Sequence, residues 1–198
     1  MAVDPSKFCT LNVADTCAIW NLLSSQLLYS VARSAGCAFC CTSFVQYECL
    51  HKPRKCHDSH DQELQQRLRT KLRQNEIEAF SIDIADLQDV MVLEGRKRVS
   101  KGELSSIAFA KKTRQAFMTD DQGARKLAEV FLPAGRTQTT PHLFGWLFFT
   151  AKLTDTDKNT IVTQHNEVGR PLQPHFEEMY TQALAFRLMA SATAQSSG

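Results

Sequence analysis

Five acidic side chains stand where apolar segments of the chain give way to helical ones. They are Asp15, Glu48, Glu103, Asp120 and Asp121. Like charges that gather at one place repel each other and are costly to bury, and a hard divalent cation such as Mg²⁺ or Mn²⁺ relieves that repulsion by binding carboxylate oxygens. A carboxylate cluster of this kind suits hydrolysis of a phosphodiester, because the metal polarises the phosphate and lowers the pKa of the attacking water.

Each of these acids also has a purely structural interpretation. An aspartate that precedes a helix, as Asp15 and Asp121 do, is often an N-cap. Glu48 on a helix can be a solvated surface acid, and Glu103 can favour the positive end of a helix. Asp121 is therefore an auxiliary metal ligand or a cap, and the sequence leaves both roles open.

The segments that must bring the acids together alternate between strand and helix. Apolar or alternating runs predict strands at 11–14, 37–42, 79–84 and 115–119. Helices are predicted at 17–35, after Ser43, at 61–74, 85–93, from Glu103, at 122–132, at 141–153 and around 176–184. This alternation predicts an α/β fold, a three-layer α/β/α arrangement with a mostly parallel central sheet of four to five strands and extra C-terminal helices. The acids then meet at the carboxyl ends of the strands, where ligands bind in such sheets.

Length and composition are those of one globular domain. The chain has 198 residues, 43% hydrophobic and 22% charged, with a formal net charge of +2 that names no partner. We expect a nuclease-like domain at 1–153, a C-terminal helical extension packed on it at 154–190, and a disordered tail at 191–198. No apolar run of about 18 residues and no signal-like N-terminus is seen. With seven cysteines, an odd number, a reducing cytoplasmic location is expected and no membrane contact.

Four segments together resemble the PIN domain, a family of metal-dependent nucleases that includes bacterial ribonuclease toxins and RNA-processing enzymes. The segments are NVADTCAIWNLL (12–23), SFVQYECL (43–50), KGELSSIAFAKK (101–112) and MTDDQGARKLAE (118–129). In that family an Asp ends the first strand, a Glu lies in the helix after the second, an acid opens the helix before the fourth, and one or two Asp residues end the fourth. The resemblance covers roughly residues 10 to 150. The family's small Gly-Thr turn is replaced by RTQTTPHLFGW, which leaves open whether a hydroxyl group from there contacts metal or phosphate.

The resemblance implies an endoribonuclease that uses Mg²⁺ or Mn²⁺. The matching positions are Asp15, Glu48, Glu103 and Asp120 as catalytic metal-site acids, with Asp121 beside them. It also implies an RNA substrate, and it allows an antitoxin or other protein partner and a homodimer. The alternative function is a catalytically inactive PIN-like module that binds RNA or a protein, in which the acids are caps.

Basic residues around the acids are candidate RNA contacts. They are Lys52, Arg54, Lys55, Arg98 and Lys101. On a nearly neutral protein such patches can attract a polyanion. Solvated surface charge is the alternative interpretation.

Thiol and imidazole groups between residues 49 and 60 suggest a second kind of metal site. They are Cys49, His51, Cys56, His57 and His60. These are zinc ligands by type, although their spacing matches no standard zinc finger. A loop with solvated histidines is the alternative.

Two common catalytic motifs are not found. The sequence contains neither a Gly-rich phosphate loop nor a Gly-x-Ser-x-Gly elbow, which disfavours ATP-driven chemistry and serine hydrolysis. The segment TDTDKNT (154–160) lacks the apolar strand of an aspartyl-phosphate loop, so Thr154 or Asp155 is predicted to cap a helix.

Overall fold

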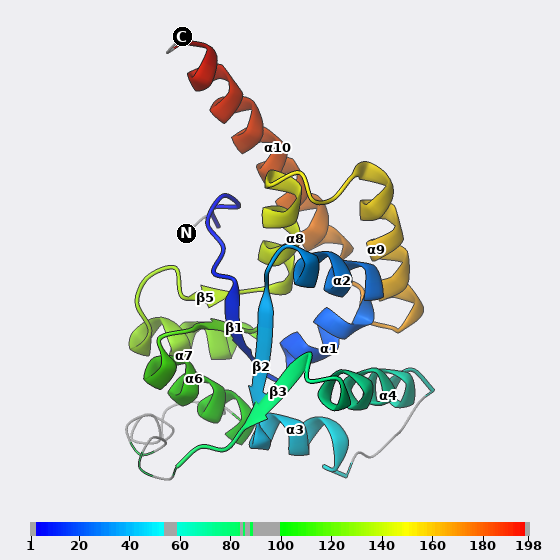
Figure 1. The fold of residues 1–198 in the computed structure, drawn as a ribbon, viewed down its shortest axis with the longest axis vertical. Coiled ribbons are helices and arrows are strands. Elements are labelled where there is room, and N and C mark those ends of the chain that lie inside the picture. The colour runs from blue at the N-terminus through cyan, green and yellow to red at the C-terminus, as the bar shows by residue number, and fades with distance from the viewer. Residues whose placement is uncertain (1–2, 54–58, 84, 86–87, 89–99, 197–198) are drawn as a thin grey trace.

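The computed structural model describes residues 3–53, 59–83, 85, 88 and 100–196, and these form a parallel sheet enclosed by helices (Figure 1). The strands are β1 (Leu11–Ala14), β2 (Ala38–Thr42), β3 (Ile77–Phe80), β4 (Ala116–Met118) and β5 (Thr137–Gln138). Their order is β3-β2-β1-β4-β5, and every neighbouring pair is parallel. The expected α/β class with a parallel sheet of four to five strands is confirmed.

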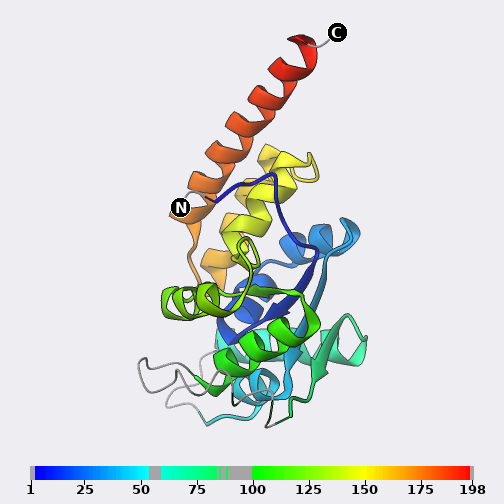
Figure 2. The ribbon, with the colours of Figure 1, turned by 90° about the vertical axis from the view of Figure 1, so that its left-hand side faces the viewer.

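Helices cover both faces of this sheet. The helices between β1 and β4 in the chain are α1 (Thr16–Ser24), α2 (Gln26–Ser34), α3 (Ser43–Leu50), α4 (Ser59–Arg73) and α6 (Lys101–Thr113). The later ones are α7 (Gln122–Phe131), α8 (Thr140–Phe149), α9 (Asp155–Glu167) and α10 (Gln173–Ser196). Helices α6 and α7 lie on one face, and α1, α2 and α8 lie on the other, which gives three layers (Figures 1 and 2).

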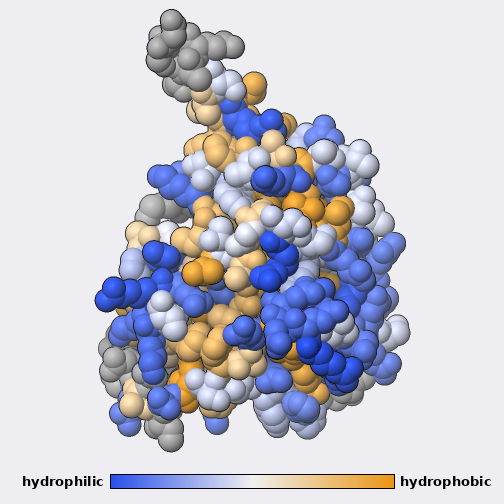
Figure 3. Space-filling view, in the orientation of Figure 1, coloured by the Kyte–Doolittle hydropathy of each residue, from blue (hydrophilic) through white to orange (hydrophobic). Residues whose placement is uncertain are grey.

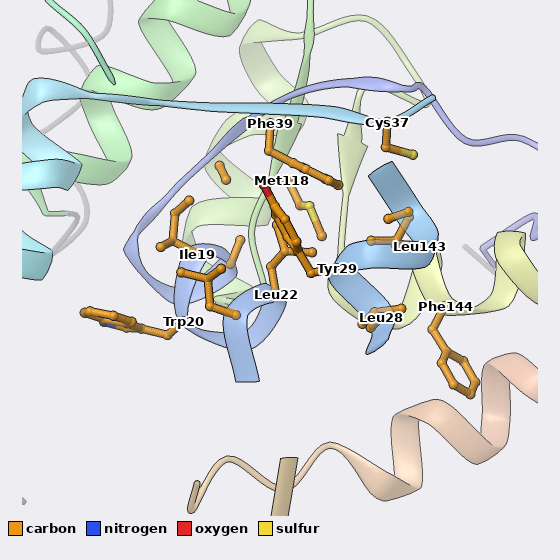
Figure 4. Close-up of a cluster of buried hydrophobic side chains, with 14 of the residues drawn as sticks. Ile19, Trp20, Leu22, Leu28, Tyr29, Cys37, Phe39, Met118, Leu143 and Phe144 are labelled. Carbon is orange, nitrogen blue, oxygen red and sulfur yellow. The ribbon is translucent and has the colours of Figure 1, made fainter. Parts of the chain in front are cut away.

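Alternation along the strands divides the core into two clusters. Phe39 of β2 packs with α1, α2 and α8, whereas its neighbour Cys40 packs with α6 on the other face. Met118 and Phe117 of β4 divide in the same way. Figure 4 shows the larger cluster, in which labelled side chains of α1, α2, β2, β4 and α8 meet. Successive side chains of a strand point to opposite faces, so a short apolar run in this sheet is buried on both sides.

The C-terminal helices extend the larger cluster. Phe176 of α10 is fully buried, and its ring centroid lies 4.6 Å from that of Phe144 in α8. Met179 and Ala183 are buried on the same face, as the helical spacing predicts. Beyond this contact α10 projects from the body of the protein (Figures 1 and 2). The helix continues through Ser196, whereas the sequence led us to expect a disordered tail from residue 191.

The single helix predicted at 17–35 is two helices in the structure. The break falls at Ser25, whose backbone is extended and whose hydroxyl oxygen accepts a hydrogen bond from the amide of Leu28 at 3.0 Å. The same hydroxyl donates to Oε1 of Gln164 in α9 at 2.6 Å. The apolar spacing continues across Ser25, so the sequence pattern did not predict this break.

Other boundaries differ by a few residues. The strand predicted at 79–84 begins earlier, at Ile77, and ends at Phe80, because it pairs with β2 from Phe39 to Thr42. Ile84 and most of the helix predicted at 85–93 lie outside the described residues. The predicted cap at Thr154 is confirmed, since its hydroxyl oxygen accepts from the amide of Asp157 in a capping box.

The surface helix α4 has the narrow apolar stripe that its sequence predicts. Leu64 and Leu68 are buried, while the rest of the helix presents mostly polar side chains, visible as the blue surface at lower right in Figure 3. Of the helices that the structure describes, none combines the length and apolar character needed to cross a membrane.

Candidate functional site

The sheet reverses its strand order beside β1. Chain order moves outward from β1 to β2 and β3 on one side, and from β1 to β4 and β5 on the other. In open α/β sheets a crevice forms at such a reversal, outside the carboxyl ends of the strands. Asp15 directly follows β1, and Thr119 and Asp120 follow β4. The amide of Asp15 donates to the carbonyl oxygen of Met118 at 3.1 Å, so these two strand ends lie side by side.

Asp15 is fully buried at this crevice. One carboxylate oxygen accepts from the amide of Ala18 at 2.8 Å and so caps α1, and the other accepts from the hydroxyl of Thr119 at 2.5 Å. Burial raises the pKa of Asp15 to about 7, and the charges of Asp120 and Glu103 push it in the same direction, while the two hydrogen bonds oppose the rise. Asp15 therefore caps α1 and is also a buried carboxyl group whose charged form is disfavoured.

Asp120 accepts hydrogen bonds from three neutral donors. Oδ1 accepts from the amide of Thr140 at 2.9 Å, and Oδ2 accepts from the hydroxyl of Thr140 at 2.6 Å and from Nδ2 of Asn21 at 2.8 Å. Thr140 begins α8 and lies in RTQTTPHLFGW, the segment whose role the sequence left open. Its hydroxyl reaches the acid cluster through Asp120.

Asp121 is exposed and caps α7. Its Oδ1 accepts from the amide of Ala124 at 2.7 Å, while its own amide donates to the hydroxyl oxygen of Thr119 at 3.1 Å. The Thr119 hydroxyl is thus shared between Asp15 and the backbone of Asp121. Of the two roles that the sequence left open for Asp121, the structure displays the cap.

Glu48 and Glu103 enter the crevice from the β2 side, at the start of α6. Glu48 Oε2 accepts from the hydroxyl of Thr16 at 2.7 Å, and Oε1 accepts from the amide of Gly102 at 3.3 Å. A Cβ atom at position 102 would lie 2.5 Å from Oε2 of Glu48, so a larger residue there would displace the Glu48 carboxylate. Glu103 forms a capping box with Ser100, in which its Oε2 accepts from the Ser100 amide at 2.7 Å.

Electrostatic coupling joins the two sides of the crevice. Burial raises the pKa of Glu103, and the charges of Asp121 and Glu48 add to the rise. Since Asp15 feels Asp120 and Glu103, the acids from both sides share one electrostatic environment. The structure therefore brings Asp15, Glu48, Glu103, Asp120 and Asp121 to the same edge of the sheet, as the sequence predicts.

Positive charge near these acids is sparse. Lys52 Nζ lies 3.8 Å from Oε1 of Glu48, and this is a half-exposed pair. Within the described part of the chain, no ion pair involves the other four acids. The pKa of the Cys17 thiol beside them is raised to about 12 by burial and then by Asp120 and Asp15, so it stays protonated and is no thiolate nucleophile.

A cation would suit this donor set by its chemistry. Carboxylate and hydroxyl oxygens are the ligands that Mg²⁺ and Mn²⁺ take, and mutual repulsion of the acids favours a bound cation. Among the described residues, no group of three or more histidine, cysteine or acidic side chains is arranged so that it could hold a metal ion. Cation binding at this edge therefore requires the carboxylates to rotate away from the hydrogen bonds that hold them.

Two cavities open on the acid cluster. One, of about 280 Å³, is lined by Asp120, Arg125 and His175, and Arg125 Nε is buried there without a hydrogen-bond partner among the described residues. The other, of about 590 Å³, is lined by Glu48 with Lys52 and Lys101, two of the predicted RNA contacts. The remaining predicted contacts, Arg54, Lys55 and Arg98, lie outside the described residues.

The zinc hypothesis receives no geometric support from the part of the segment that is described. Cys49 is buried in α3, while His51 and His60 are exposed. Cys56 and His57 lie outside the described residues. Cys49, His51 and His60 do not converge on a common point.

Sequence reasoning missed the neutral residues that hold the acids. Thr16, Asn21, Thr119 and Thr140 supply the side-chain donors. Asn21 gives a signal in retrospect, because it is an amide within the otherwise apolar run Ile19–Leu23. Thr140 gives none, since it is one of four threonine or glutamine residues in TQTT.

No protein-family model matches this chain, and comparisons with curated proteins and with solved structures also returned no match.

Proposed function

We propose that the protein is an endoribonuclease that depends on Mg²⁺ or Mn²⁺. The observation that carries the proposal is the presence of five acids at one edge of the sheet, at the β1–β4 strand reversal, where their side-chain partners among the described residues are neutral donors and Glu48 alone forms an ion pair, with Lys52. Helix capping alone does not account for charges that raise the pKa of Asp15 and Glu103. Asp15, Glu48, Glu103 and Asp120 would hold the cation, with Asp121 as an auxiliary ligand that also caps α7.

When bound, the cation supplies Lewis-acid polarisation of the phosphate and a more acidic water. The chain's own residues have separate tasks. Thr140 and Asn21 orient Asp120, Thr16 orients Glu48, and such outer contacts hold ligands in place. Arg125 faces the cavity beside Asp120 and is placed to neutralise a phosphate of the bound strand.

The resemblance to PIN domains supports RNA as the substrate. A ribonuclease toxin with an antitoxin partner, or an RNA-processing enzyme, is the biological setting that the resemblance allows, with a cytoplasmic location and a homodimer. A small antitoxin-like reading frame beside the gene would favour the toxin.

The substitution Asp15→Asn tests the proposed chemistry. It keeps the size of the side chain and the acceptor for the Ala18 amide, and it removes the charge. Cleavage of a single-stranded RNA in Mn²⁺ should fall by at least about 100-fold, on the scale of losses at metal sites. Asp83→Asn, at a side chain 85% exposed, is the matched control and should cleave like the unaltered protein. Equal cleavage by both variants would contradict the assigned role.

A second candidate function has its own supporting observation. Asp15 caps α1, Asp121 caps α7 and Glu103 completes a capping box, so three of the acids already have a structural role as helix caps. This favours a silent module that binds RNA or a protein partner. Calorimetric titration with Mn²⁺ distinguishes the two functions: the nuclease should bind Mn²⁺ and lose this binding in Asp15→Asn, and the silent module should show no binding.

A further inference from the structure

The largest cavity beside the acids is formed by one face of α3 and the start of α6. Phe44, Tyr47, Glu48 and Lys52 line it from α3 and its C-terminal end, and Lys101 lines it from α6. The spacing of three and four residues places Phe44, Tyr47 and Glu48 on one face of α3, and Lys52 follows the end of the helix. At about 590 Å³ the cavity is within the range of about 300–1,000 Å³ that holds small organic ligands.

Tyr47 presents an aromatic ring to this cavity that the fold does not need. Its side chain is 53% exposed, while Val45 and Cys49 on the inner face of α3 are fully buried. The ring of His51 stacks against it, with centroids 6.3 Å apart and an angle of 30° between the planes. Tyr47 is thus backed on one side and open to a planar ligand on the other.

Two lysines line the same cavity as this ring. Lys101 is exposed, and the Lys52 side chain is 57% exposed, so both ammonium groups can reach a ligand. Lys52 follows α3 and Lys101 begins α6, and both line the cavity together with Tyr47 and Glu48. A flat ring in a cavity that also holds two cations is complementary to a ligand that joins an aromatic heterocycle to phosphates, as a nucleotide of a polynucleotide does.

We propose that this cavity is a base-binding subsite for single-stranded RNA. One base stacks on Tyr47, and Lys52 and Lys101 contact the phosphates on either side of it. Glu48 belongs both to the cavity and to the acid cluster, so a strand held here runs directly into the crevice. A base can lie on Tyr47 only when it is unpaired, so the subsite selects single strands over duplexes. The inference rests on the proposed function for the choice of RNA.

The test measures binding in EDTA, where metal-dependent cleavage is off. The probe is a single-stranded RNA oligonucleotide that carries the fluorescent base 2-aminopurine, whose emission falls on stacking. Tyr47→Ala should weaken binding by roughly 5-fold to 150-fold, the loss typical of one stacked base, and should abolish the fall in emission. Tyr47→Phe should retain both. Phe186→Ala, at an exposed aromatic on the projecting half of α10, is the matched control and should change neither.

The failure of this inference differs from failure of the proposed function. If Tyr47→Ala binds as tightly as the unaltered protein, or if the matching duplex binds as tightly as the single strand, the subsite is wrong even when the protein cleaves RNA. If the protein binds the probe through Tyr47 but never cleaves RNA in Mn²⁺, the nuclease proposal is wrong and the subsite is supported.

Discussion

The acid cluster and the C-terminal helical layer of α8, α9 and α10 bury ionisable groups in opposite ways. At the cluster, Asp15 is surrounded by further acids, and burial raises its pKa to about 7. In the helical layer, His165 is packed edge-on against Phe176, with centroids 5.0 Å apart, and burial lowers its pKa to about 4. Burial disfavours the charged form of both groups.

The difference between the two regions lies in what the neighbours do. His165 is neutral, its Nδ1 donates to the carbonyl oxygen of Arg170 at 3.1 Å, and the ring of Phe176 packs against it. Because His165 stays neutral above about pH 4, the nearby charge of Arg170 leaves no repulsion for a ligand to relieve, although the Nε2 atom of His165 is buried without a hydrogen-bond partner among the described residues. The negative charges of Asp120 and Glu103 oppose the ionisation of Asp15, so a cation bound beside these acids would stabilise their charged forms. The helical layer is therefore built for stability, and the cluster keeps a repulsion that a ligand can relieve.

The largest expected effect is on stability in the helical layer. Phe176→Ala removes a fully buried ring that contacts Phe144 and His165, and it should lower the free energy of unfolding by about 3–5 kcal/mol. Denaturant unfolding measures this. Phe186→Ala on the same helix, where the ring is 38% exposed, should change it by less than about 1 kcal/mol. Similar losses in both variants would contradict the contrast drawn between the buried and projecting halves of α10.

A smaller effect is expected from pH at the cluster. The unfolded chain releases the Asp15 proton near pH 3.8, whereas the folded protein keeps it to about pH 7, so Asp15 makes the metal-free protein less stable as the pH rises through this window. The loss should be on the order of 2–4 kcal/mol, somewhat below the full shift in pKa. Asp15→Asn should abolish it, so the difference in unfolding free energy between the two proteins should grow from pH 4 to 7.

His165 provides a second check on this measurement, because its contribution to the unfolding free energy changes with pH in the opposite direction. The unfolded chain takes up a proton below about pH 6.5, and the folded protein does so only near pH 4, so His165 makes the protein less stable as the pH falls through that window. Asp15→Asn leaves this contribution in place, and its stability should decline more steeply than that of the unaltered protein as the pH falls from 6.5 to 4. Parallel profiles for the two proteins would show that Asp15 has an ordinary pKa.

The smallest expected effect is on RNA affinity beside Asp120. Arg125→Gln removes a cation from the cavity and should weaken binding of single-stranded RNA by about 5-fold to 10-fold, near 1 kcal/mol. The slope of log affinity against log salt should fall by about 0.7, because one fewer phosphate is neutralised. Arg114→Gln, at an exposed arginine that ends α6 far along the helix from Glu103, is the control. An unchanged salt slope for Arg125→Gln would remove the phosphate role.

Local patterns were sufficient to place the acids along the chain. Short apolar runs predicted β1, β2 and β4, because residues buried on both faces of a parallel sheet are almost all apolar. The spacing of Phe176, Met179 and Ala183 predicted the buried face of α10 for a similar reason, since helical side chains three and four apart share a face. The acids follow these elements directly, so their gathering at one edge could be predicted from the parallel topology.

Contacts between distant segments decided the rest. Ser25, at the break between α1 and α2, donates to Gln164, 139 residues away, and the short strand β5 pairs with β4. Asn21 and Thr140 reach Asp120 across 99 and 20 residues, so nothing local marks them as its partners. The exposure of Tyr47 could not be predicted from the sequence either, because aromatic residues in helices are commonly part of the core.

The sequence by itself determined which residues are acidic, that β1, β2 and β4 lead to them and which helix faces are apolar, because these depend on composition and local periodicity. Only the tertiary structure decided that β1 and β4 are neighbours, that neutral donors hold the acids, and that a cavity with an open aromatic ring lies beside Glu48. Those features are distances between segments, and a distance in space has no fixed signature in the order of residues.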